Sequence, residues 1–124
     1  MKIRVIEDGL VEKDTIEVIH VEFDINVLQV TVRIDGYRIN IEFDAPVGYR
    51  VLDEGDLLEF WPQCSSSEGW LYEILTDGWL SQESQRQGFL SAHNNDVKEY
   101  FVIGCNYCVG VLSWEDPSVS ESIR

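Results

Sequence analysis

Positively charged residues are scarce in this 124-residue chain. Nine lysines and arginines stand against 23 aspartates and glutamates, which gives a formal net charge of -14 and a pI near 4.2. Such a charge repels the phosphates of nucleic acids and anionic membrane surfaces, and the sequence lacks the basic stripe that nucleic-acid binding requires. The composition therefore disfavours nucleic acid as a partner. It favours a basic protein, which the negative field would steer into fast encounter.

Long apolar runs are also missing. No stretch approaches the roughly 20 residues that a membrane-spanning helix needs. The segment Met1–Glu7 reaches an acidic residue before an apolar run builds up, so we expect no secretory signal. The three cysteines are an odd number and do not indicate a disulfide framework. We therefore expect a protein of the reducing cytoplasm, without a membrane span.

Residues that carry catalysis or bind metals are few. The two histidines, His20 and His93, lie in ordinary surroundings, and the chain has neither a glycine-flanked serine nor a phosphate-binding glycine loop. Cys105 and Cys108 have the spacing of half a zinc site, which Cys64 and one histidine would have to complete. Two small apolar side chains near a tight turn explain this pair adequately. We therefore predict a protein without catalytic activity, cofactor or bound metal.

The clearest structural pattern lies between residues 28 and 43. Apolar residues alternate with polar ones on both sides of Asp35-Gly36, a dipeptide typical of a two-residue turn. The alternation predicts an antiparallel hairpin with its apolar side chains on one face. A two-residue loop sets four pairs: Ile34 with Tyr37, Val32 with Ile39, Val30 with Ile41, and Leu28 with Phe43.

Other segments give weaker patterns. Residues 2–7 alternate weakly and predict a short first strand. In residues 15–25 the apolar positions change parity, which predicts a β-bulge near Ile19 and His20. Residues 84–90 fit either the end of a strand or one helical turn.

Two apolar runs near the C-terminus, 100–103 and 109–114, have apolar residues at both parities. That pattern predicts central strands buried on both faces. Taken together, the patterns predict one α+β, β-rich domain over residues 1–115, built on an antiparallel β meander with one or two short helices. The polar residues 116–124 are predicted to form a loose tail.

The stretch 68–83, EGWLYEILTDGWLSQE, contains an acidic-Gly-Trp-Leu motif twice. If Asp77-Gly78 closes a two-residue hairpin, Glu83 lies beside the ring of Tyr72. Such a hairpin is either part of the core or a binding surface in which Glu83 contacts a cationic partner. Its register places four side chains on one face: Trp70, Tyr72, Ile74 and Trp79.

Acidic residues crowd the segment 53–61, which fits either a helix or a strand. Like charges held this close repel one another, so they cost stability unless something cationic offsets them. The segment is either a solvated loop or part of an interface. Four acids lie within seven residues without a lysine or arginine among them: Asp53, Glu54, Asp56 and Glu59.

The second half of the chain resembles small bacterial immunity proteins, the cytoplasmic antidotes encoded beside polymorphic or contact-dependent toxins. The resemblance lies in LDEGDL at 52–57, the doubled motif with Glu83, and EYFVIG through CVGVLS at 99–113. It implies an inhibitor that binds a secreted toxin domain and blocks its active site or substrate path. Many such toxins are nucleases with basic surfaces, which an acidic inhibitor would suit.

The charge and the resemblance together predict a surface that binds the cognate toxin domain. Two other functions stay open: a DNA mimic whose carboxylates imitate phosphates, and a small-molecule binding module or enzyme with a deep pocket walled by tryptophans. The predicted acidic contacts are Asp53, Glu54, Asp56, Glu59 and Glu83, and the predicted aromatic anchors are Trp61, Trp70 and Trp79.

Overall fold

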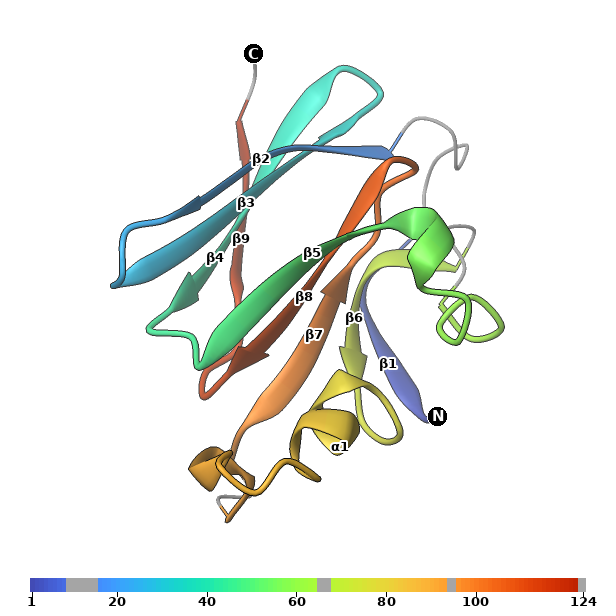
Figure 1. The fold of residues 1–124 in the computed structure, drawn as a ribbon. Helices are drawn as coiled ribbons and strands as arrows, with labels where there is room; N and C mark the ends of the chain where they lie inside the picture. The colour runs from blue at the N-terminus through green and yellow to red at the C-terminus, as the bar shows by residue number, and fades with distance from the viewer. Residues whose placement is uncertain (9–15, 65–67, 94–95, 123–124) are drawn as a thin grey trace.

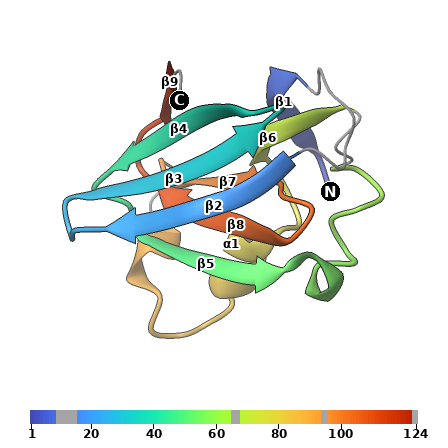
Figure 2. The same ribbon diagram turned by 90° about the horizontal axis from the view of Figure 1, so that it is seen from above.

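The computed structural model describes residues 1–8, 16–64, 68–93 and 96–122. In this part of the chain, two antiparallel sheets face each other as a sandwich (Figures 1 and 2). One sheet has the strand order β1-β6-β7-β8-β5, and the other has the order β2-β3-β4-β9. The elements in chain order are β1 Ile3–Asp8, β2 Ile16–Phe23, β3 Val27–Ile34, β4 Tyr37–Asp44, β5 Gly48–Asp53, the 3-10 turn η2 Glu54–Asp56, β6 Gly69–Ile74, α1 Trp79–Glu83, the 3-10 turn η3 Leu90–His93, β7 Lys98–Val102, β8 Tyr107–Ser113 and β9 Ser118–Ser122.

This architecture confirms the predicted β-rich α+β fold with short helical pieces. The hairpin predicted between residues 28 and 43 is formed by β3 and β4, and all four predicted residue pairs occur. Asp35 and Gly36 have φ angles of 51° and 83°. Both values are positive, as a type I′ turn requires. Antiparallel neighbours in sequence, β2-β3-β4 and β6-β7-β8, provide the predicted meander.

The predicted β-bulge is confirmed in β2, where the register shifts between Val18 and His20. Beside it, the turn between β7 and β8 contacts the edge of β2. Asn106 Nδ2 donates to the carbonyl oxygen of Val18 at 3.1 Å, and Asn106 Oδ1 accepts from the Val18 N–H at 3.2 Å. The Cys105 N–H donates to the Ile16 carbonyl oxygen at 2.8 Å. One asparagine amide thus takes the place of a neighbouring strand and joins the two sheets.

Two main hydrophobic cores lie on the two faces of the five-stranded sheet, and a smaller cluster contains Phe89, Val97 and Leu112. The larger core fills the space between the sheets and contains the apolar face of β3 and β4 together with inward side chains of β7 and β8. A second core lies on the outer face, where residues 57–64 cover β6, β7 and β8. Burial on both faces explains the continuous apolar sequence of β7 and β8, which confirms the prediction of central strands.

The hairpin predicted around Asp77-Gly78 is wrong. Asp77 has a positive φ of 63°, and the chain then enters α1 instead of returning along β6. The cause lies on β7, where the Glu99 carboxylate accepts hydrogen bonds from the N–H groups of Trp79 at 3.0 Å and Leu80 at 2.8 Å. These N–H groups have no partner within the helix, because they belong to its first turn. A Cβ at Gly78 would lie 2.7 Å from Glu99 Oε1, so only glycine allows this approach.

The C-terminal residues also differ from expectation. Part of the predicted loose tail, residues 118–122, forms β9 and pairs with β4 from Glu42 to Arg38. The sequence of this segment is polar and residues 118–121 are exposed, which is why its composition resembles a tail. A short edge strand needs backbone pairing rather than burial, so a polar sequence can form one.

Candidate functional site

The four acids Asp53, Glu54, Asp56 and Glu59, called the acidic cluster below, lie where β5 ends. The chain leaves the sheet at Asp53 and turns through η2. Asp53 Oδ1 accepts a hydrogen bond from the Gly55 N–H at 2.8 Å, which fixes the turn. All four acids are exposed. Within the described residues, no ion pair joins any of them to a lysine or arginine, so their mutual repulsion lacks a short-range offset.

The second core holds the acidic cluster in place. The segment 53–61 is neither a full helix nor a strand but the turn η2 followed by further turns. The Phe60 ring, 1% exposed, stacks on Phe101 with a centroid distance of 4.6 Å. Trp61 Nε1 donates to the carbonyl oxygen of Glu54 at 2.9 Å. The exposed carboxylates are therefore carried by a packed segment, which keeps them close together before any partner arrives.

The three predicted tryptophan anchors occupy different environments. Trp61 is half-buried beside the acidic cluster, with its ring 5.9 Å from that of Phe101. Trp79 is half-buried on α1, and the Arg50 guanidinium lies over its ring at 4.8 Å. Trp70 is only 4% exposed and packs in the core between the sheets. Its burial gives it a structural role, and Trp61 is the tryptophan that the structure places with the acids.

Glu83 is already engaged within the protein. Its Oε2 accepts from Trp79 Nε1 at 3.0 Å, and its Oε1 accepts from Arg86 Nε at 2.7 Å. The hydrogen bond from Arg86 lowers the pKa of Glu83, with a smaller contribution in the same direction from Trp79. The predicted contact with the Tyr72 ring depended on the hairpin that does not form. Glu83 therefore has its own hydrogen-bond partners and, in the described part of the chain, makes no hydrogen bond or ion pair with the acidic cluster. Arg50 is attracted by both Glu83 and Glu59.

Glu99 is a buried acid that the sequence patterns did not single out. Its side chain lies at a hollow of about 330 Å³ between α1 and the end of β6, and it is 2% exposed. Burial raises the pKa of Glu99, while the N–H groups of Leu80 and Trp79 and the charge of Arg50 act in the opposite direction. Both carboxylate oxygens hold the start of α1. An acid within the apolar sequence of β7 is the signal that could have identified it.

A second concave surface lies on the outer face of the four-stranded sheet. This groove of about 530 Å³ is polar, and the Thr31 hydroxyl donates to Asn40 Oδ1 at 2.8 Å across its floor. Arg33 and Arg38 lie opposite each other in the register of β3 and β4, and Glu17 lies opposite Arg33 on β2. Among the described residues, the lining of the groove includes both arginines and no acid, so its charge is opposite to that of the acidic cluster.

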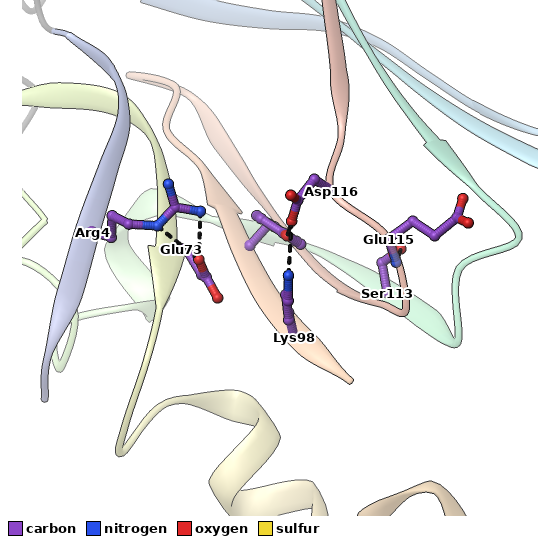
Figure 3. A network of polar contacts seen from close by, with 7 residues as sticks. Arg4, Glu73, Lys98, Ser113, Glu115 and Asp116 are labelled. Atoms are coloured by element: carbon purple, nitrogen blue, oxygen red, sulfur yellow. Dashed lines mark hydrogen bonds and ion pairs between the residues drawn. The ribbon is translucent and has the colours of Figure 1, made fainter. Parts of the chain in front are cut away.

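Two neighbouring groups of polar contacts lie on the five-stranded sheet, one joining β1 to β6 and the other joining β7 to the linker between β8 and β9 (Figure 3). Arg4 donates to Glu73 Oε1 through Nε at 2.9 Å and through a terminal nitrogen at 2.6 Å. The Tyr100 hydroxyl and Lys98 Nζ both donate to Asp116 Oδ1, at 2.5 Å and 3.1 Å. The carboxylates of Glu73 and Asp116 each accept from a cationic or hydroxyl donor. The second group therefore fastens the linker to the sheet, and both acids are less available to a partner than those of the acidic cluster.

Asp116 makes the stability of the protein depend on pH in the acidic range. The Tyr100 hydrogen bond, followed by that of Lys98, holds the pKa of Asp116 below its ordinary value of 3.8. A carboxyl with a lowered pKa stabilises the folded state above its ordinary pKa, and the contribution is lost as pH falls through the folded value. We expect the variant Asp116→Asn to lose stability less steeply than the wild type below about pH 4. Urea unfolding between pH 2 and 6 measures this, and parallel profiles would contradict it.

The cysteines lie in mixed surroundings. Burial raises the pKa of Cys64 to about 12 and that of Cys108 to about 11, so both thiols stay protonated at neutral pH. Cys105 is exposed at the turn before β8. His20 lies 3.3 Å from Glu22, and the side chain of His93 is outside the described part of the structure. Within the described residues, no three His, Cys, Asp or Glu side chains form a group that could hold a metal ion.

No helix in the described part of the chain is both long enough and apolar enough to cross a bilayer. Comparisons with protein-family models, with curated proteins and with solved structures find no match to this chain.

Proposed function

We propose that this protein is a cytoplasmic immunity protein of a bacterial toxin system, which neutralises a basic toxin domain by covering it. The acidic cluster is the observation that carries the proposal. Its four exposed carboxylates have no ion-pair partner in the described residues, and they are held by the packed segment 57–64. Lysines and arginines of a partner would offset their repulsion, and the rigid support reduces the entropy lost on binding.

Long-range charge and local packing would contribute to different steps of binding. The net charge of -14 attracts a basic domain and sets a fast, salt-dependent association rate. Trp61, half-buried beside Glu54, provides an aromatic surface whose further burial would slow dissociation. Asp53 also holds the turn by its bond to Gly55, so Glu54, Asp56 and Glu59 are the acids most available for contact.

Co-expression tests this function in cells. If the neighbouring gene encodes a large secreted protein with a variable C-terminal toxin domain, this chain should restore growth to cells that express that domain. A DNA mimic would instead compete with DNA for many unrelated DNA-binding proteins. Failure to restore growth, or a location within a metabolic operon, would contradict the proposal.

A further inference from the structure

The two sheets end in four edge strands, β1 and β5 in one sheet and β2 and β9 in the other. An exposed edge offers backbone groups to any passing strand, and proteins protect edges with bulges, prolines and charges. In β1 the register shifts on both sides of Glu7. In β2 it shifts after Val18, and the Asn106 amide covers that residue. The last edge, β9, follows Pro117 and is made mostly of serines and a glutamate.

In the described part of the chain, β5 carries two charges, Arg50 and Asp53, but neither a bulge nor a proline. It pairs with β8 from Gly48 to Asp53 without a register shift, and it contains no proline. Its one cation, Arg50, lies over the ring of Trp79 on α1. Two apolar side chains of β5 are partly open to solvent, Tyr49 at 37% and Val51 at 40%.

The backbone of β5 presents a regular row of groups on its open side. The Glu54 N–H donates to the Asn106 carbonyl oxygen just beyond the paired residues. Because antiparallel ladders alternate, Leu52 and Arg50 also direct their backbone groups toward β8. Tyr49, Val51 and Asp53 then direct theirs away from β8, at the two-residue spacing that an added strand requires.

The side chains beside this row favour an occupant that alternates in polarity. Tyr49 and Val51 lie opposite Val111 and Val109, which belong to the core between the sheets. The Tyr49 ring meets Phe23 of β2 with a centroid distance of 5.5 Å. Apolar side chains of an added strand would continue this layer. At the far end of β5, the acidic cluster and the half-exposed Tyr107, opposite Asp53, provide a negative and aromatic rim.

We propose that the open edge of β5 receives an extended segment of a basic partner protein as a sixth strand of the five-stranded sheet. This inference rests on the proposed function and adds the mode of contact: backbone pairing along Tyr49–Asp53, with lysine or arginine against the acidic cluster. Charge selects this occupant over a second copy of the chain, because a copy would bring a further net charge of -14.

Amide exchange measured by NMR tests the edge directly. The probe is an octapeptide in which lysine and valine alternate. In the protein alone, the amides of Tyr49, Val51 and Asp53 should exchange fast and those of Arg50 and Leu52 slowly. Saturation with the probe should slow exchange at the first three. A peptide of equal charge that is N-methylated at every second residue, on the side facing β5, should bind at least about tenfold more weakly.

Substitutions in β5 separate backbone pairing from charge. Val51→Pro removes an outward N–H and should lower the affinity for the octapeptide at least about tenfold. Val51→Thr keeps that donor and should bind the octapeptide as the wild type does. If Val51→Pro does not fold, Tyr49→Pro near the start of the strand provides the second variant, because it removes another outward N–H without changing the charge. Unfolding curves of each variant establish that the fold is retained.

Three results would overturn the inference. The peptide could fail to bind at millimolar concentration. It could bind with an affinity that neither N-methylation nor the proline variants change, in which case charge-driven binding stands without the added strand. The protein alone could double in mass by light scattering while the three edge amides become protected, which would assign the edge to a second copy. Failure of the co-expression test would contradict the proposed function, and it can be told apart from these three results, which concern only the edge of β5.

Discussion

Replacing Phe101 with alanine is expected to lower the free energy of unfolding by about 3 to 5 kcal/mol. Phe101 is 2% exposed on the outer face of β7 and stacks on Phe60. Truncation removes the apolar surface that anchors the segment 57–64 and leaves a cavity beneath it. Urea unfolding gives the magnitude, and amide exchange should show faster local opening of this segment than of β3.

The matched control is Val119→Ala on β9. Val119 is 37% exposed, so its truncation should change the free energy of unfolding by less than about 1 kcal/mol. A double-mutant cycle between Phe101 and Phe60 should also show coupling, because the two rings are in contact. Additive losses at these two positions would contradict a packed second core beneath the acidic cluster.

Glu99→Ala is expected to lower the free energy of unfolding by about 3 to 5 kcal/mol, since two N–H groups lose their buried carboxyl acceptor and the removed side chain leaves a cavity. The Trp79 and Leu80 N–H groups would be left without this acceptor at the start of α1. Arg50 would also lose the first of the charges that attract it. Thermal and urea unfolding measure the loss, and the exposed substitution Glu115→Ala should leave stability within about 0.5 kcal/mol of the wild type.

Glu99→Gln separates shape from charge at the same position. The amide oxygen can keep one of the two hydrogen bonds, whereas the amide nitrogen cannot accept the other, so the loss should be smaller than in the alanine variant but not zero. Because burial raises the pKa of Glu99 above 4.5, the folded state holds its proton more tightly than the unfolded chain does. The contribution of this group is therefore greatest below pH 4.5 and declines as pH rises. The glutamine variant should lack that decline, and an equal slope in both proteins would contradict the assignment.

Local patterns were sufficient to predict the fold where a strand pairs with its neighbour in the sequence. The alternation from Leu28 to Phe43 predicted both strands, the turn and the register, since each pair depends only on its own side chains. The parity change predicted the bulge in β2 for the same reason. The pairing of β1 with β6 and of β5 with β8 joins distant segments, and no local pattern carries that information.

Long-range contacts explain why the predictions of a hairpin at Asp77-Gly78 and of a loose C-terminal tail are wrong. Asp77-Gly78 has the composition of a hairpin turn, but Glu99, about twenty residues later in the chain, binds the following N–H groups and starts a helix. The polar C-terminal residues form β9 because β4 offers an edge to pair with. The local sequence of 77–83 does not reveal its contact with Glu99, and that of 118–122 does not reveal its pairing with β4.

The candidate site was predicted in part. The four acids of the cluster lie together and exposed, as their density in the sequence indicates. Glu83 and Trp70 are engaged within the fold, one by Trp79 and Arg86 and the other in the core. The open edge of β5 was not predicted, because whether a strand is central or at an edge depends on the order of the whole sheet.

The central claim is that the acidic cluster binds a basic toxin domain, and the affinity of the purified complex tests it most directly. Calorimetry would compare the wild type with Glu54→Lys/Asp56→Lys, which leaves the turn-holding Asp53 intact. The control Glu42→Lys/Asp44→Lys makes the same change in net charge at exposed positions on β4. We predict that the first variant binds roughly tenfold to a hundredfold more weakly, and that the control binds much more nearly like the wild type. Equal affinities of the two variants, with both proteins folded, would contradict the claim.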